Sequence, residues 1–250
     1  MDFIRADFYR LMRSKAFWIS QFLLFCTLVS TILFRLSSSF SLAVTISNTE
    51  TAPQKFTGLE AALQFVGKSD EFIFFTLIGV SLILGVDVSK KLYKNCLSYG
   101  ISKLRYYLSK LLVCISFATF QLLFVLGITF TTASLTNGVG RFSTHILVTL
   151  VLTLLIRFLY TITWISIAFL VICASHSITS VFIVYFIGNF LLTLPLLIYP
   201  QNEWLLCLSL RFDTSTVTEN ARLIKASFTS LFLTTIFLTS GLIIFKKKNL

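Results

Sequence analysis

Residues 90–110, KKLYKNCLSYGISKLRYYLSK, interrupt a strongly apolar chain with six lysines and arginines and no acid. An apolar run precedes this stretch, from Phe72 to Val88, and another follows it, from Leu111 to Leu135. Both runs are close to the ~20 residues that a helix needs to cross ~30 Å of hydrocarbon. The stretch is therefore predicted to connect two transmembrane helices, and its charge indicates on which side of the membrane it lies.

The composition of the whole chain supports a membrane protein. Of its 250 residues, 56% are hydrophobic and 12% are charged, whereas a soluble domain carries about 25% charged residues. The net charge of +11 is a pattern also found in nucleic-acid-binding proteins. A soluble protein could not bury this many apolar side chains, so we expect a lipid bilayer around the chain and no nucleic-acid partner.

Six apolar runs are long enough to span a bilayer. The fifth contains Gly188, Asn189 and Pro195 and is predicted to be kinked or broken. We therefore predict an all-α membrane protein in which residues 16–250 form a single six-helix transmembrane domain. The runs are residues 16–34, 72–88, 111–135, 146–174, 178–199 and 228–245.

The distribution of basic residues predicts that both termini are cytoplasmic. With this orientation, residues 1–15, residues 89–110, the link near His176 and the tail from Lys246 lie inside and hold 13 of the 21 lysines and arginines. The outside segments hold seven bases and seven acids. These predicted extracellular segments are residues 35–70, 136–145 and 200–227.

The first 15 residues, MDFIRADFYRLMRSK, have the periodicity of an amphipathic helix. Ile4, Phe8, Leu11 and Met12 share one face, so we expect a helix in the membrane interface with its basic face toward anionic headgroups. A generic positive flank for the first span is the alternative. A cleaved signal peptide is disfavoured because two acids precede the run, which is itself of full span length.

The predicted outer segment 200–227 contains the sequence NEWLLCLSLRF, which is amphipathic but too short to span. It is compatible with short helices that dip in from the outer face or with an interfacial loop.

Positive-inside placement explains the sign of the charge in residues 90–110 but not its pattern. The pattern predicts a short helix up to about Leu97, a turn at Tyr99–Gly100, and a second helix capped by Ser102 that continues into the third span. An apolar stripe at helical spacing favours a docking surface over a solvated loop. The stripe consists of Leu97, Ile101, Leu104, Leu108 and Leu111.

The string DVSKKLYKNCLSYGISKLRYYLSKLL resembles the segment after the second span in permease subunits of type-2 ABC exporters. That family has an acid near the end of the span, a Lys-Asn pair, a Gly-Ile-Ser-Arg/Lys step and a Tyr-Tyr-Leu-Ser-Lys-like run. Leu92-Tyr93 stand where the family often has Gly-Thr. The matching positions are Asp87, Lys94, Asn95, Gly100, Ile101, Ser102, Lys103, Tyr107, Leu108, Ser109 and Lys110.

The resemblance implies that residues 89–110 couple the chain to a dimer of a cytoplasmic ATPase. It implies a second copy of this chain, or a related permease, beside it. ATP and Mg²⁺ would bind the ATPase, because this chain has no GxxxxGK[ST] motif and needs no cofactor of its own. Chains of this length and layout resemble the exporters of lantibiotic self-immunity, which implies an antimicrobial or amphipathic peptide as cargo and the plasma membrane of a Gram-positive bacterium.

Other functions are compatible with parts of the sequence. Export of a drug, a lipid-linked polysaccharide or an ion is possible within the same family. A non-transporting sensor or assembly protein could bind a partner through residues 89–110. A secondary transporter is disfavoured because the spans lack runs of acids.

No GxSxG, HExxH or EExxxR-like motif is present, and the five scattered cysteines suggest neither a disulfide framework nor a metal site. We therefore expect no catalytic residues.

One charge falls inside a predicted span. Arg157 lies ~16 Å from the start of the fourth run at Ile146, and an arginine there costs ~2.5–3.5 kcal/mol, which the surrounding apolar residues offset. Our hypothesis is that Arg157 lines the substrate path or a dimer interface and attracts a carboxylate. The alternatives are that it pairs with a protein group or snorkels outward.

Overall fold

The computed structural model describes residues 2–33, 57–68, 71–98, 100–140, 143–199, 202–210 and 220–247. These residues form helices joined by turns, and no strand occurs among them. The helices are α1 (Asp2–Arg13), α2 (Lys15–Leu33), α3 (Gly58–Lys68), α4 (Glu71–Val80), the π-helix η1 (Ser81–Gly85), α5 (Val86–Ser89), α6 (Tyr93–Ser98), α7 (Lys103–Asn137), α8 (Thr144–Ser175), α9 (Thr179–Ile198), α10 (Glu203–Leu208) and α11 (Asn220–Lys247).

Six helical segments in the described part of the chain are long and apolar enough to cross a membrane. A bilayer offers no water to unpaired backbone groups, so each apolar run satisfies them within its own helix. This confirms the predicted all-α membrane class. The six segments are Lys15–Leu33, Phe72–Ser89, Lys103–Asn137, Thr144–Ser175, Thr179–Ile198 and Ala221–Lys247.

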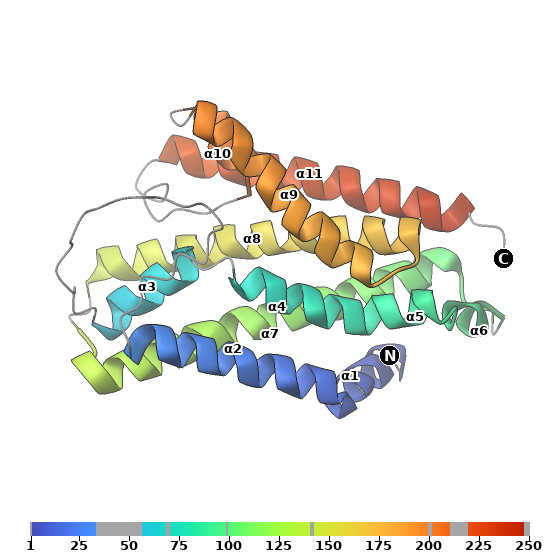
Figure 1. Ribbon diagram of the computed structural model, residues 1–250, viewed down its shortest axis with the longest axis horizontal. Helices are drawn as coiled ribbons and strands as arrows, with labels where there is room; N and C mark the ends of the chain where they lie inside the picture. The colour runs from blue at the N-terminus through green and yellow to red at the C-terminus, as the bar shows by residue number, and fades with distance from the viewer. Residues whose placement is uncertain are drawn as a thin grey trace.

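The long helices run side by side, and their connections gather at two ends (Figure 1). One end carries α1, α6, the α8–α9 link and the C-terminal end of α11, and we call it the basic end. The opposite end carries α3, α10 and the α7–α8 connection. This arrangement matches the orientation predicted from the basic residues, which placed both termini and residues 89–110 on the same side.

The helix–turn–helix predicted in the basic stretch is confirmed. Helix α6 ends at Ser98, Gly100 has a φ of 82° and α7 begins at Lys103. Ser102 caps α7, since its side chain accepts a hydrogen bond of 3.3 Å from the backbone N–H of Arg105. Tyr99 lies outside the described residues.

Polar side chains join the long helices inside the bundle. Gln21 of α2 donates to Gln121 of α7 over 3.0 Å. Thr163 of α8 lies 3.0 Å from the hydroxyls of both Ser230 and Thr234 of α11. In a bilayer, hydrogen bonds of this kind replace the hydrophobic effect as the force between helices.

Helix α3 was not predicted. Residues 58–68 fall in the segment 35–70, which we expected to be a polar extracellular loop, yet Leu59, Ala62 and Val66 are buried against the bundle. The backbone N–H of Gly58 donates to Gly138 over 2.9 Å. A Cβ on Gly58 would stand 2.1 Å from Ser134 Oγ, so glycine permits the close approach of α3 to α7. Residues 34–56 lie outside the described part.

Two further expectations need correction at the C-terminal half. Helix α9 is continuous, with Pro195 near its end, so it is not broken. Helix α11 begins at Asn220, which moves residues 220–227 from the predicted extracellular segment into the sixth long helix. For the apolar sequence NEWLLCLSLRF, a short helix or an interfacial loop was expected, and the structure has the short helix α10. Glu203 of α10 accepts hydrogen bonds from Arg222 (3.3 Å) and Lys225 of α11.

The turn at Gly100 gives a testable prediction. Replacing Gly100 with alanine places a Cβ at a φ of 82°, and we expect it to lower the free energy of unfolding by about 1–2 kcal/mol. Gly127→Ala is the matched control, because Gly127 lies inside α7 with open space around it; there alanine should be neutral or stabilising by up to about 1 kcal/mol. Thermal unfolding in detergent measures both, and equal effects would contradict the assigned turn.

Candidate functional site

The two ends of the basic stretch meet inside the bundle. Asp87 lies in α5 at the end of the second span, and Lys110 lies ~10 Å along α7 from its start. Lys110 Nζ is 2.6 Å from Asp87 Oδ2, and each side chain is only 5% exposed. Both residues were predicted as coupling residues. The ion pair between them joins the two ends of the α5–α6–α7 connection.

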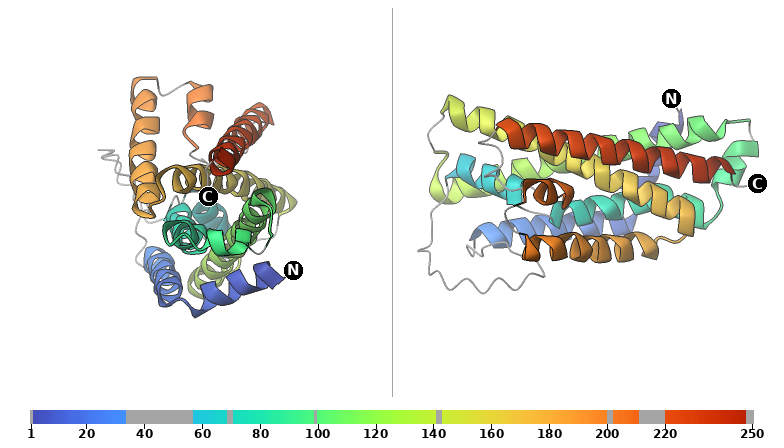
Figure 2. Two further views of the ribbon diagram at one scale, coloured as in Figure 1. Left: turned by 90° about the vertical axis from the view of Figure 1, so that its right-hand side faces the viewer. Right: turned by 90° about the horizontal axis from the view of Figure 1, so that it is seen from above.

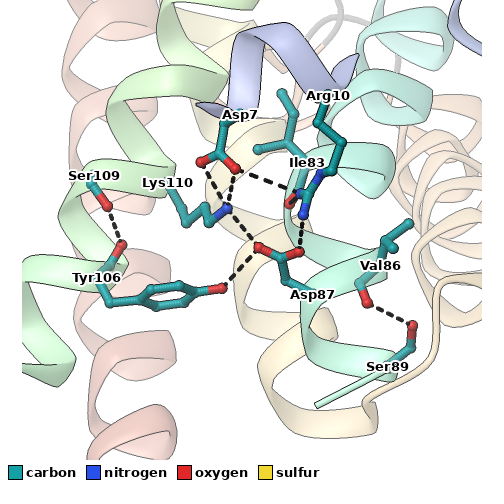
Figure 3. Close-up of polar contacts among 9 residues, drawn as sticks. All are labelled: Asp7, Arg10, Ile83, Val86, Asp87, Ser89, Tyr106, Ser109 and Lys110. Carbon is teal, nitrogen blue, oxygen red and sulfur yellow. Dashed lines mark hydrogen bonds and ion pairs between the residues drawn. The ribbon is translucent and has the colours of Figure 1, made fainter. Parts of the chain in front are cut away.

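Helix α1 adds a second acid and a second base to this pair. Lys110 Nζ lies between the two acids (Figure 3) and donates to Asp7 over 2.6 Å and 2.7 Å. Arg10 donates through Nη1 to Asp87 and through Nη2 to the carbonyl of Ile83 over 2.9 Å. We call Asp7, Arg10, Asp87 and Lys110 the ion cluster; it joins α1, α5 and α7.

The ion cluster is electrically balanced. Two carboxylates face two cations, and Tyr106 donates a hydrogen bond of 3.1 Å to Asp87. Burial works to lower the pKa of Arg10, but its hydrogen bond and charge pairing with Asp87 outweigh that effect and raise the pKa, so Arg10 stays charged. Balance matters because a buried charge without a partner is strongly destabilising.

The π-helix η1 supplies a carbonyl to the cluster. The backbone N–H of Val86 bonds to Ser81 O, five residues earlier, so the regular four-residue pattern is interrupted here. Ile83, inside this segment, accepts from Arg10 instead. The π-helix thereby positions Asp87 and a backbone acceptor toward the same guanidinium.

The remaining predicted coupling residues lie outside the cluster. Lys94 and Asn95 are exposed on α6, and Ile101 is half-buried. Lys103 donates to the carbonyl of Lys246 over 3.1 Å, so it ties the start of α7 to the end of α11. Gly100 forms the turn and Ser102 the cap, as described above.

Of the predicted apolar stripe, Ile101 and Leu111 are half-buried, and the side chain of Leu97 lies outside the described residues. Leu104 and Leu108 are 42% and 48% exposed on α7. The opposite face of that helix carries the buried Tyr106, Tyr107 and Lys110. Leu104 and Leu108 therefore lie on the outward face of α7.

Arg157 lies inside a single chain. Its side chain is fully buried, and its guanidinium is 5.1 Å from the centre of the Phe72 ring, a cation–π distance. This placement is incompatible with outward snorkelling and with a direct contact to a second copy. Within the described part of the chain, the gap that it lines with Val66, Leu122 and Val125 is too small for a water molecule.

Sequence reasoning missed the role of Asp7, Arg10 and Tyr106. Asp7 was not among the residues assigned to the apolar face of the N-terminal helix, yet it is 8% exposed. A signal was present: Asp87 and Lys110 stand at the edges of apolar spans, where an isolated charge needs a partner. The pattern did not show that the partner would come from the first helix.

Comparisons with protein-family models, with curated proteins and with solved structures found no match to this chain. The chemistry of the site therefore has to be judged from its geometry. Its charged groups are mutually paired, and the described residues contain no group of three or more His, Cys, Asp or Glu that could hold a metal ion. Such an arrangement can fix three elements relative to one another.

Removing one charge from the cluster tests this role. Lys110→Met leaves two buried carboxylates with only Arg10, and we expect the free energy of unfolding to fall by about 3–5 kcal/mol. Adding Asp7→Asn restores neutrality and should recover a substantial part of the loss. Unfolding titrations in mixed micelles measure both variants.

Lys94→Met is the control, because Lys94 is exposed and its replacement should change stability by no more than about 0.5 kcal/mol. A Lys110→Met variant as stable as this control, or a double variant less stable than Lys110→Met alone, would contradict the role of the ion cluster.

Proposed function

We propose that this chain is the membrane-spanning subunit of an ATP-driven exporter, and that the α5–α6–α7 connection docks on a cytoplasmic ATPase. The observation that carries the proposal is the construction of this connection. The connection presents exposed lysines at the end of the bundle, Lys90 and Lys91 in the turn and Lys94 on α6, and is anchored on both sides by a buried ion pair. The resemblance of residues 87–110 to type-2 ABC exporter permeases supports the same function.

The surface of the connection suits a docking role. On α6, Lys94, Asn95 and Ser98 are exposed, and Lys91 is exposed in the turn before it. The inner side of α6 packs on the bundle through Tyr93, whose ring centre lies 5.8 Å from that of Phe245 in α11. A partner surface with acidic groups would complement these lysines.

The anchoring of the connection suits transmission of a movement. A push on α6 reaches the second span through Asp87, the third through Lys110 and the sixth through Lys103 and Tyr93. Packed helices move as units because their interiors are dense. Closure of an ATPase dimer against α6 would therefore shift several spans together.

The finer features of the function follow from the resemblance. We propose that two copies, or this chain and a related permease, form the conduit in the plasma membrane of a Gram-positive bacterium. The proposed cargo is an antimicrobial or amphipathic peptide. Aromatic side chains exposed toward the bilayer on α2, α9 and α11 fit a cargo that enters from the membrane; they include Phe22, Phe186, Phe190, Phe228 and Phe232.

Affinity purification with charge reversal tests the proposal. The tagged protein is purified in mild detergent beside a Lys91→Glu/Lys94→Glu variant, and co-purifying proteins are identified by mass spectrometry. We expect an ABC ATPase in stoichiometric amount with the natural sequence and at least a tenfold loss in the variant, because both lysines are exposed on the docking surface.

Lys247→Glu is the matched control, since it reverses an exposed charge at the same end but on α11; it should retain the ATPase. Absence of an ATPase from the folded natural protein would contradict the exporter. A histidine kinase or an assembly partner in its place would indicate the non-transporting alternative.

A further inference from the structure

We propose that the outward face of α1 is a binding surface for anionic phospholipid headgroups of the leaflet at the basic end. This surface consists of Arg5, Tyr9, Met12 and Arg13 together with Trp18 of α2, and we call it the headgroup surface. The proposal goes beyond the exporter function and does not depend on it, because it requires only that the long helices cross a bilayer.

The direction of α1 places it in the plane of the membrane. Both views in Figure 2 show α1 running across the long axis of the bundle, at the end where the chain begins. Helix α2 starts two residues after α1 ends, at Lys15, and enters the bundle. If the long helices span the bilayer, α1 lies at its surface, at the level of the headgroups.

The ion cluster determines which face of α1 is turned outward. Asp7 and Leu11 are 8% and 4% exposed and face the bundle. Apart from the small Ala6, the exposed residues recur at positions i, i+4, i+7 and i+8, which is one face of a helix; they are Arg5, Tyr9, Met12 and Arg13. Met12 therefore faces outward rather than sharing the packed face with Leu11.

The outward face combines the groups that a headgroup region binds. Tyr9 is 66% exposed and Met12 50% exposed, between two arginines. Among the side chains described in α1, residues 5–13, Asp7 is the only acid, and it forms an ion pair with Lys110. The face turned to the surroundings is thus basic, with an aromatic and an apolar side chain, as in interfacial helices.

Continuity with the first span favours lipid over a soluble partner. Trp18 donates its indole N–H to the carbonyl of Met12 over 2.7 Å, so its ring extends the α1 surface onto α2. Trp18, Ile19 and Phe22 are each more than half exposed and would face the acyl chains. A tryptophan at the boundary between a charged surface and an apolar one is typical of the membrane interface.

Lipid binding and the ion cluster share one rigid helix. Asp7 and Arg10 of α1 enter the cluster, while Arg5 and Arg13 of the same helix are exposed. Anionic headgroups that hold α1 against the bilayer therefore also hold Asp7 and Arg10 against α5 and α7. The charge of the leaflet would act on the connection that carries α6.

Quenching of Trp18 measures the lipid preference directly. The full chain with Trp204→Phe is reconstituted in phosphatidylcholine vesicles that contain increasing amounts of brominated phosphatidylglycerol. Trp18 then is the exposed reporter, since Trp164 is 3% exposed. We expect preferential quenching by phosphatidylglycerol. The preference should fall about fivefold for each arginine replaced and about 25-fold in an Arg5→Gln/Arg13→Gln variant.

Three controls decide the outcome. Lys94→Gln should keep the preference, and 1 M salt should abolish it in the parent protein because charges are then screened beyond about 3 Å. No preference in the parent, or an unchanged preference in the double variant, would overturn the proposal. Relief of quenching by inorganic phosphate at millimolar concentration would assign the surface to soluble anions and would overturn it as well.

Discussion

Two buried carboxylates, the buried Lys110 and the partly exposed Arg10 at one end of an apolar bundle are stable only together, and the arrangement of that end follows from this constraint. Lys110 reaches both Asp7 and Asp87, and Arg10 closes the group by bonding to Asp87 and to a backbone carbonyl. Leaving one of the buried charges without its partner in a low-dielectric environment strongly destabilises the folded protein. The first helix, the end of the second span and the start of the third therefore occupy one mutual position.

Among the described residues, neutral polar contacts join several of the long helices inside the bundle, while Glu203 pairs with Arg222 and Lys225 at the opposite end. The Gln21–Gln121 bond lies one helical turn beyond the ring contact of Phe17 with Phe117, as expected for two spans that run in the same direction. Hydroxyl groups join α8 to α11. Helices in lipid gain little from apolar contact alone, so such bonds and close packing determine their neighbours. The ion cluster thus marks the basic end as chemically distinct from the rest of the bundle.

The sequence was sufficient for features that depend on one segment at a time. Each long apolar run becomes a helix because a bilayer leaves it no alternative, and Gly100 and Ser102 define their turn and cap through local backbone chemistry.

Features that depend on two distant segments could not be predicted. Asp7 and Lys110 are 103 positions apart, and no periodicity relates them. Helix α3 lay in a segment that looked polar as a whole, although Leu59, Ala62 and Val66 have helical spacing. The spacing of Leu104 and Leu108 was real, but spacing alone does not distinguish a lipid-facing side from a protein-facing one.

The central claim is that α6, with the exposed lysines on it and in the turn before it, contacts a cytoplasmic ATPase, while the ion cluster fixes the positions of the helices that the connection joins. The most direct measurement is photo-cross-linking in intact cells from a photoreactive amino acid placed at Asn95, which is exposed on α6, followed by identification of the adduct. The account predicts a cross-link to an ABC ATPase. Efficient cross-linking to other proteins, with no ATPase adduct, would contradict it.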